Sequence, residues 1–214
     1  MSFSIPFLLI TAAYLLGSIP TAVWAGRLFH GIDVREYGSG NAGATNVLRV
    51  LGWKTAIPVL LIDMGKGFLA VKIISFTHIF LPGSSYFIHY QIIAAIAAVL
   101  GHVFPIFAGF KGGKGVATMA GVVLAILPQP FLVAICVFII TLLLTRYVSV
   151  SSIMAGFSFP ISVMFIFSTG NKEILIFSLA VFILLLITHR NNIERLFSGE
   201  EKKFRPAKPS RENS

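Results

Sequence analysis

Residues 131–147 read FLVAICVFIITLLLTRY, a continuous apolar run that ends beside a cation. Similar runs recur along the chain, and several approach the roughly 20 residues that a helix needs to cross a bilayer. Of the 214 residues, 56% are hydrophobic and only 12% are charged, whereas soluble domains carry about 25% charged residues. The runs are continuous rather than alternating, which disfavours a β-barrel. The sequence therefore predicts an all-α polytopic membrane protein.

About seven transmembrane helices are expected, within a single domain over residues 1–197. They cover residues 3–25, 55–79, 88–108, 116–129, 131–147, 153–169 and 174–189. The fourth is short and ends at Pro128-Gln129-Pro130, so the fourth and fifth alternatively form one kinked or re-entrant unit. The first has no cation before its apolar run and no clear cleavage site after it, so we expect a retained helix rather than a signal peptide.

The positive charges predict the orientation of these helices. With the N-terminus outside, every Lys and Arg except Lys66, Lys72 and Lys172 lies on the cytoplasmic face, as the positive-inside rule requires. The net charge of +9 is then explained by loops that face anionic lipid, not by nucleic acid. The C-terminus is cytoplasmic, and the composition of the basic tail, residues 198–214, predicts disorder.

The first of three polar motifs is Gly38-Ser39-Gly40-Asn41-Ala42-Gly43-Ala44-Thr45-Asn46-Val47-Leu48-Arg49. Its glycines permit positive φ and close approach to a ligand, and successive amides in such loops bind anions. Ser39, Asn41, Thr45 and Asn46 add neutral donors, and Arg49 adds a planar fork suited to phosphate. The alternative is a Gly-rich hairpin whose Asn and Thr cap helices.

The second motif, Lys111-Gly112-Gly113-Lys114-Gly115, directly precedes the fourth apolar segment. Two lysines are unfavourable at a helix N-terminus unless an anion lies between them and the helix dipole. The motif lacks the first glycine and the Ser or Thr of a Walker A loop, which disfavours nucleotide hydrolysis. The alternative is a cytoplasmic turn that carries lysines because of its side of the membrane.

The third motif, His189-Arg190-Asn191-Asn192-Ile193-Glu194-Arg195-Leu196, closes the last apolar segment. His189, Asn192 and Arg195 are spaced three apart, so they line one side of a helix. The alternative is that the cations cap a helix C-terminus. Ser149, Ser151 and Ser152 follow Arg146-Tyr147 on the same membrane side, where they are candidate hydroxyl donors or helix caps.

Three further polar residues lie within the apolar segments. His102 is either a base or, as we favour, a histidine hydrogen-bonded between helices. Asp63 and Lys66 lie one turn apart, and they either pair with each other or contact a substrate. The chain has no pattern of His, Cys, Asp or Glu that is typical of metal ligands, so we expect no metal and no cofactor.

The chain resembles the PlsY family, the bacterial membrane acyl-phosphate:glycerol-3-phosphate acyltransferases, at GSGNAGATNVLR (38–49), GHVFPIFAGFKGGKGVAT (101–118) and HRNNIERL (189–196). The resemblance extends from the first helix to Leu196 and departs at Ala42, where a common family form has Pro. It implies acyl transfer from acyl phosphate to the 1-hydroxyl of sn-glycerol 3-phosphate, which gives lysophosphatidate and phosphate in phospholipid synthesis. It also implies a multi-pass protein of the bacterial inner membrane with its active site on the cytoplasmic face. The expected partners are both substrates, membrane lipid and, as a further candidate, a soluble enzyme that supplies acyl phosphate.

The motifs and the resemblance together yield a set of expected site residues. Lys114 and its turn, with Thr45 and Asn46, are expected to hold acyl phosphate, while Arg49, Lys111, Ser39 and Asn192 hold glycerol 3-phosphate; the division between the two lysines is open. His189 is the candidate base because its unperturbed pKa is near working pH, and a substrate phosphate is the rival. The expected catalytic residues are His189, Ser39, Lys114 and Asn192, and the expected substrate-binding residues are Gly40, Asn41, Thr45, Asn46, Arg49, Lys111, Gly112, Gly113, Gly115, Ser152 and Arg195.

Two other functions compete with acyl transfer. A transporter of a phosphorylated metabolite would need polar residues along a path to the outer face, yet the polar groups gather on one side. A structural lipid-binding protein would need the basic loops but not the placement of Ser, Asn and His.

Overall fold

The structure is a computed structural model that describes residues 4–77, 79–168 and 170–204, and every regular element in those ranges is a helix. The helices at the N-terminal half are α1 (Ser4–Gly17), α2 (Thr21–His30), η1 (Val34–Glu36), α3 (Ala44–Leu51), α4 (Trp53–Phe76), α5 (Ser85–Val103) and η2 (Ile106–Ala108). They are followed by α6 (Val116–Ile126), α7 (Pro128–Thr145), α8 (Val148–Ile161) with its π-helical extension η3 (Ser162–Ile166), α9 (Lys172–Thr188) and α10 (Arg190–Phe197).

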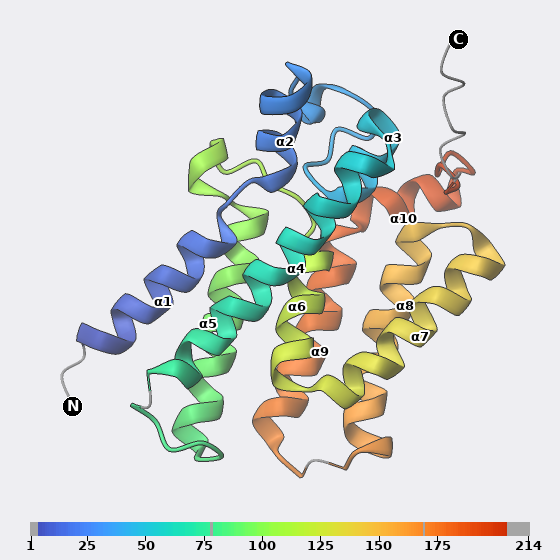
Figure 1. The fold of residues 1–214 in the computed structure, drawn as a ribbon. Helices are drawn as coiled ribbons and strands as arrows, with labels where there is room; N and C mark the ends of the chain where they lie inside the picture. The colour runs from blue at the N-terminus through green and yellow to red at the C-terminus, as the bar shows by residue number, and fades with distance from the viewer. Residues whose placement is uncertain (1–3, 78, 169, 205–214) are drawn as a thin grey trace.

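The long helices form a bundle, and the short ones gather at one of its ends. Helix α1 packs against α5, α4 against α6, and α7 against α8. Figure 1 shows α2, α3 and α10 together at the upper end of the bundle. The loops that carry the three polar motifs therefore meet at this end.

Glycines allow the helices to approach closely at two crossings. A Cβ on Gly67 would lie 2.2 Å from the carbonyl oxygen of Thr118, and one on Gly121 would lie 1.9 Å from that of Met64. Helices α4 and α6 can therefore touch backbone to backbone. Between α1 and α5, Gly17 has the same role, because its Cβ would lie 2.0 Å from the carbonyl oxygen of Ala98. Small residues at the contact faces are typical of helix pairs in membranes, where close packing replaces the hydrophobic effect.

Among the residues that the structure describes, three helical segments are individually long and apolar enough to cross a membrane, namely Ser85–Ala108, Pro128–Thr145 and Val148–Ile166. Two bent pairs raise the number to five if each is one span: Ile5–Gly17 with Thr21–His30, bent by 43°, and Lys172–Thr188 with Arg190–Phe197, bent by 58°. The prediction of an all-helical membrane protein is confirmed at this level. The count of seven spans and the orientation stay predictions.

The observed helices differ from the expected segments at their ends and breaks. The first segment is interrupted at residues 18–20, which include Pro20, and the fourth and fifth are separate helices divided at Leu127. Within the described ranges, α7 exposes Leu132, Ile140, Leu143 and Leu144, as a lipid-facing helix does.

The division of the chain after residue 197 and the disorder of the tail stay predictions. Residues 205–214 lie outside the described residues. Residues 198–204 turn back on the bundle: the amide of Glu201 donates to the carbonyl of Arg195 at 3.0 Å, and that of Phe204 to the carbonyl of Arg146 at 2.6 Å.

Candidate active site

Asn46 organises the first motif. Its side chain is 1% exposed, and its Oδ1 accepts from the amide and the hydroxyl of Ser39 at 2.8 and 3.1 Å. Its Nδ2 donates to the carbonyls of Val34 and Tyr37 at 2.8 and 3.1 Å. All four hydrogen-bonding positions of the amide are thus used, so Asn46 holds the loop, and its contact with a substrate stays a prediction.

The loop that Asn46 holds has two residues in the left-handed region, Gly38 at φ +66° and Gly40 at φ +71°. A Cβ on Gly38 would lie only 2.3 Å from Oδ1 of Asn46, so the turn requires glycine there. Ser39 and Gly40 are exposed, and Asn41 and Thr45 are half-buried. Neither Asn41 nor Thr45 has a side-chain hydrogen bond to the described part of the chain, so both have donor capacity for a ligand.

The second motif lies between the first motif and helix α5. A Cβ on Gly113 would lie 2.4 Å from Nε2 of His102 and 2.9 Å from the carbonyl oxygen of Ala42. The amides of Gly112 and Gly113 donate to the carbonyls of Val103 and His102 at 3.1 and 3.2 Å. Because these two amides are used within the protein, they hold the loop in place. The loop can then contribute to phosphate binding through the position that it gives to its neighbouring residues.

Arg35, which the sequence analysis did not select, supports the same loop from the other side. Its Nη1 donates to the carbonyls of Ala108 and Lys111 at 2.9 and 3.1 Å, while Asp33 accepts from its Nη2 at 2.7 Å. This hydrogen-bonded pairing with Arg35 holds the pKa of Asp33 well below its usual range. Lys111 itself has an exposed side chain. Gly115, with φ +79°, is the N-cap residue of α6.

Lys114 joins the second motif to the third. Its Nζ donates to Oδ1 of Asn192, and Nδ2 of Asn192 donates to Oε1 of Glu201 at 2.7 Å. The same oxygen accepts from the hydroxyl of Ser149 at 2.8 Å, and Oε2 accepts from Nε of Arg195 at 3.0 Å. One carboxylate is therefore surrounded by donors from α8, α10 and, through Asn192, the Lys114 loop.

Burial and charge set the protonation of this cluster. Burial lowers the pKa of Lys114 to about 8, the carboxylate of Glu201 opposes that effect, and Arg195 and Arg49 add to it. Burial raises the pKa of Glu201, but hydrogen bonds from Asn192, Ser149 and Arg195 outweigh it, so the net pKa lies below the usual value. Glu201 is thus ionised at neutral pH. Lys114 loses its proton about one unit above neutral pH.

His189 lies at the junction of α9 and α10 and is 2% exposed. Its Nδ1 lies 2.9 Å from the carbonyl oxygen of Leu185. Because a carbonyl can only accept, Nδ1 carries the hydrogen, and in the neutral ring Nε2 is the free acceptor. The described residues give Nε2 no hydrogen-bond partner, and the role of His189 as a base stays a prediction.

Two further expected residues, Arg49 and Ser152, have no hydrogen bond to the cluster around Glu201 in the described part of the chain. Arg49 is exposed, and its Nη2 donates to the carbonyl of Lys202 at 3.3 Å. Ser152 is buried, and its hydroxyl donates to the carbonyl of Val148 at 2.9 Å, within its own helix. Ser149, rather than Ser152, is the serine that reaches the cluster.

Asp63 and Lys66 form an ion pair, with 2.8 Å between Oδ1 and Nζ. The mutual pairing that was one of two expectations is therefore present. Among the described residues, no group of three or more His, Cys, Asp or Glu could hold a metal ion.

Comparisons with known proteins extend over nearly the whole chain. A family model described as glycerol-3-phosphate acyltransferase matches residues 7–199. A glycerol-3-phosphate acyltransferase of Chlorobaculum parvum is 46% identical over 220 residues, which cover 92% of this chain and 95% of that protein. One of Chlorobaculum tepidum is 44% identical over 220 residues, with the same coverage.

Two solved structures have the same fold. The crystal structure of PlsY, an integral membrane glycerol 3-phosphate acyltransferase, in its glycerol 3-phosphate form superposes with a TM-score of 0.82 at 37% identity, over 94% of this chain and 96% of that chain. Its lysophosphatidic acid form gives 0.79 at 36% identity, over 94% and 95%. With motifs, fold and relatives in agreement, the chain belongs to the glycerol-3-phosphate acyltransferase family.

Proposed function

We propose that this chain transfers an acyl group from acyl phosphate to the 1-hydroxyl of sn-glycerol 3-phosphate, giving lysophosphatidate and phosphate in phospholipid synthesis. The observation that supports this most directly is the meeting of all three motifs: Gly113 lies against Ala42, and Lys114 is hydrogen-bonded to Asn192. Donors and cations from separate segments converge there on one carboxylate, Glu201. Both substrates carry a phosphate, and this is the kind of group that such a cluster can bind.

The chemistry needs positioning more than a protein nucleophile. Acyl phosphate is a mixed anhydride, so the substrate hydroxyl can attack the carbonyl carbon directly while the bond to phosphate breaks. The proton of the hydroxyl passes to Nε2 of His189 or to a substrate phosphate. Lys114 stabilises the departing phosphate, and Ser39, Arg49 and Asn192 orient glycerol 3-phosphate; fixed donors aimed at developing charge are an effective source of rate enhancement.

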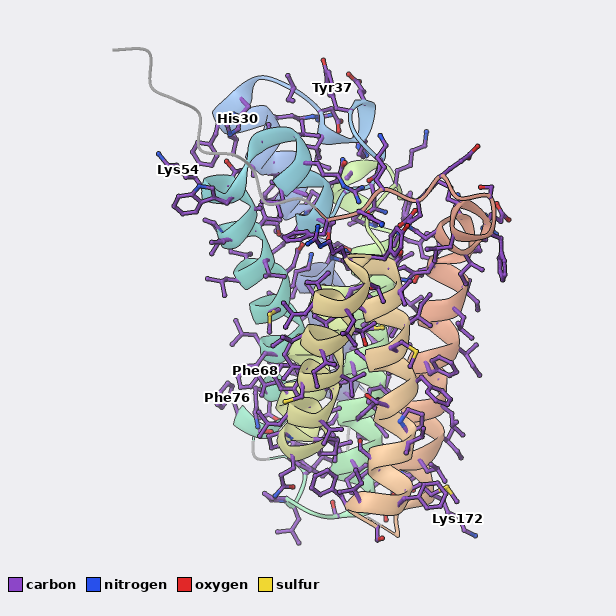
Figure 2. All side chains as sticks on the ribbon, turned by 90° about the vertical axis from the view of Figure 1, so that its right-hand side faces the viewer. His30, Tyr37, Lys54, Phe68, Phe76 and Lys172 are labelled. Atoms are coloured by element: carbon purple, nitrogen blue, oxygen red, sulfur yellow. The ribbon has the colours of Figure 1, made fainter. Side chains whose placement is uncertain are left out.

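The finer topology is part of the same proposal. Seven helices cross the inner membrane, with the N-terminus outside and the C-terminus and active site on the cytoplasmic face. Figure 2 shows His30, Tyr37 and Lys54 at one end of the bundle and Lys172 at the other. The concentration of Lys and Arg at the motif end supports its assignment to the cytoplasm. Substrates then arrive from that side, with a soluble enzyme as the source of acyl phosphate.

The test is to incubate the purified protein with acyl phosphate and labelled glycerol 3-phosphate and to measure labelled lysophosphatidate, with acyl-CoA as a parallel donor. Lys114→Ala should abolish most product, whereas Lys54→Ala, which removes an exposed cation at the same end, should not. Product from acyl-CoA alone would refute the proposed donor.

Substrate assignment needs a second measurement. Arg49→Ala and Lys114→Ala should raise the Michaelis constants for opposite substrates. If both constants are unchanged in both variants, the division of the site is wrong.

A further inference from the structure

A buried polar cluster lies below the second motif, and the proposed reaction does not use it. Its members are Thr21 of α2, Asp63 and Lys66 of α4, His102 of α5 and Thr118 of α6. Asp63, Lys66 and His102 are 1%, 5% and 6% exposed. Charged residues among apolar helices are costly and therefore usually carry a function.

Asp63 is the centre of this cluster. Its Oδ1 accepts from the hydroxyl of Thr21 at 3.0 Å, lies 2.8 Å from Nζ of Lys66, and lies 3.7 Å from Nδ1 of His102. The same Nδ1 is 3.1 Å from the hydroxyl of Thr118. This nitrogen of the imidazole is thus hydrogen-bonded to Thr118 of α6 and lies within ion-pair distance of Asp63 of α4.

The opposite nitrogen of His102 faces the glycine loop. Nε2 occupies the space next to Gly113 where a Cβ would lie, at 2.4 Å, and the carbonyl of the same histidine accepts from the amide of Gly113. The loop therefore rests on the imidazole ring. Lys114 follows Gly113 directly, so any tilt of the ring changes where the ammonium group lies.

Lys66 connects the cluster to the interruption between helices α1 and α2. Besides pairing with Asp63, its Nζ donates to the carbonyl of Ile19 at 2.8 Å. Ile19 lies in the interruption between α1 and α2, and its carbonyl also accepts from the amide of Thr21 at 3.0 Å. Lys66 thus neutralises Asp63 and links it to the backbone of that interruption.

We propose that Asp63 and His102 are positioning residues for acyl transfer: Asp63 fixes the ring of His102, which supports Gly113 and so places Lys114. This inference rests on the proposed function, which it deepens. Neither residue touches a substrate. Because misplacement of a catalytic group by about 1 Å can cost roughly 100-fold in rate, the effect should appear in kcat.

The kinetic experiment compares Asp63→Asn, His102→Ala and the double variant in the purified full-length protein. We expect kcat to fall about 10- to 100-fold in each single variant, and the double variant to be no worse than the more impaired single. Additive losses would show that Asp63 does not act through His102. Asp63→Asn/Lys66→Met avoids a stranded cation if Asp63→Asn fails to fold.

Hydrogen exchange provides a readout that needs no turnover. The amides of Gly112 and Gly113 should exchange faster in the Asp63 and His102 variants, because the carbonyls that accept from them move. Gln91→Leu is the matched control: Gln91 is a buried polar residue of α5, 6% exposed and bonded to Ser75 at 3.4 Å, outside the cluster. It should lower the melting temperature without altering loop exchange or kcat.

The two arms separate failure of the inference from failure of the function. If the wild-type protein makes no lysophosphatidate, the proposed function fails, and loop exchange still tests the support of Gly113. Folded variants with wild-type loop exchange and kcat within about two-fold of wild type would overturn the inference.

Discussion

Replacing Glu201 by Gln removes one negative charge while keeping the shape of the side chain. The site then contains Lys114, Arg195 and Arg49 without the carboxylate that opposes burial of Lys114. The Glu201 side chain is only 6% exposed, so solvent screens the charge incompletely. We therefore expect the pKa of Lys114 to fall further.

The magnitude follows from the position of the carboxylate, which is linked to Lys114 through the single amide of Asn192. Loss of a nearby opposite charge lowers the pKa of a lysine by about one pH unit, so the value of about 8 becomes about 7. The charged fraction of Lys114 at pH 8 then falls from about one half to about one tenth. At pH 6 it remains near nine tenths or above.

The sign of the activity change follows from the proposal that the charged form of Lys114 binds phosphate. Lys114 loses its proton as the pH rises through its pKa, so kcat/KM, which reports groups in the free enzyme, declines on the alkaline side. For Glu201→Gln this decline should begin about one unit lower, and the ratio of kcat/KM at pH 8 to that at pH 6 should fall about five-fold. Titration of the substrates affects all variants equally.

Two variants serve as controls for this measurement. Glu200→Gln changes the same charge at the exposed neighbouring position and should leave the profile unchanged. Lys114→Arg, which stays protonated throughout, should remove whatever part of the alkaline decline belongs to Lys114. The reasoning is refuted if Glu201→Gln leaves the decline in place or moves it to higher pH.

Three further predictions concern the motifs. Gly113→Ala should lower kcat/KM by about 100-fold, because its Cβ would lie 2.4 Å from an imidazole nitrogen, whereas Gly65→Ala, with nothing within 4 Å, should leave steady-state rates unchanged. Asn46→Ala should destabilise the protein by about 2–4 kcal/mol, seen as a lower melting temperature in detergent, since it leaves two carbonyls and the Ser39 amide without their partner. If His189 is the base, His189→Ala should abolish the part of the pH dependence of turnover that a base causes. A loss of turnover of only a few-fold, with the pH dependence retained, would exclude His189 as the base.

The sequence was sufficient to predict the helical membrane class and the joining of the three motifs. Continuous apolar runs can satisfy their backbone in lipid only as helices, so residues 131–147 alone restricted the fold. Each motif lies at one end of an apolar segment, and the predicted topology places all three motifs on the same membrane face. Their contacts at Gly113 and Lys114 agree with that prediction.

Glu201 could not be identified in this way, because the composition of residues 198–214 favours solvated chain. What places its carboxylate is a chain reversal: Gly199 adopts φ +74° after α10, and the next two amides return to the carbonyl of Arg195 at 2.8 and 3.0 Å. A glycine just past a helix end is a known stop signal. Read together with the preceding helix, it would have predicted a turn back toward the bundle.

Asn46 and Ser152 show a different limit of sequence reasoning. Both residue types can donate to phosphate, yet here each side chain bonds to its own surroundings. A sequence pattern shows which donors are available, but the partner that each donor binds depends on the carbonyls near it in the folded chain. Local backbone carbonyls compete successfully because they are present at all times and leave no buried group unpaired.

The cations of the site also explain why a buried carboxylate lies among them. Burial disfavours the charged form of Lys114, and the positive charges of Arg195 and Arg49 add to that effect. Without a phosphate, Glu201 supplies the anion that keeps Lys114 mostly protonated near neutral pH. Residues 198–204 therefore contribute to the electrostatics of a site whose motifs end at Leu196, and the cationic character of Lys114 depends on a turn that none of the three motifs contains.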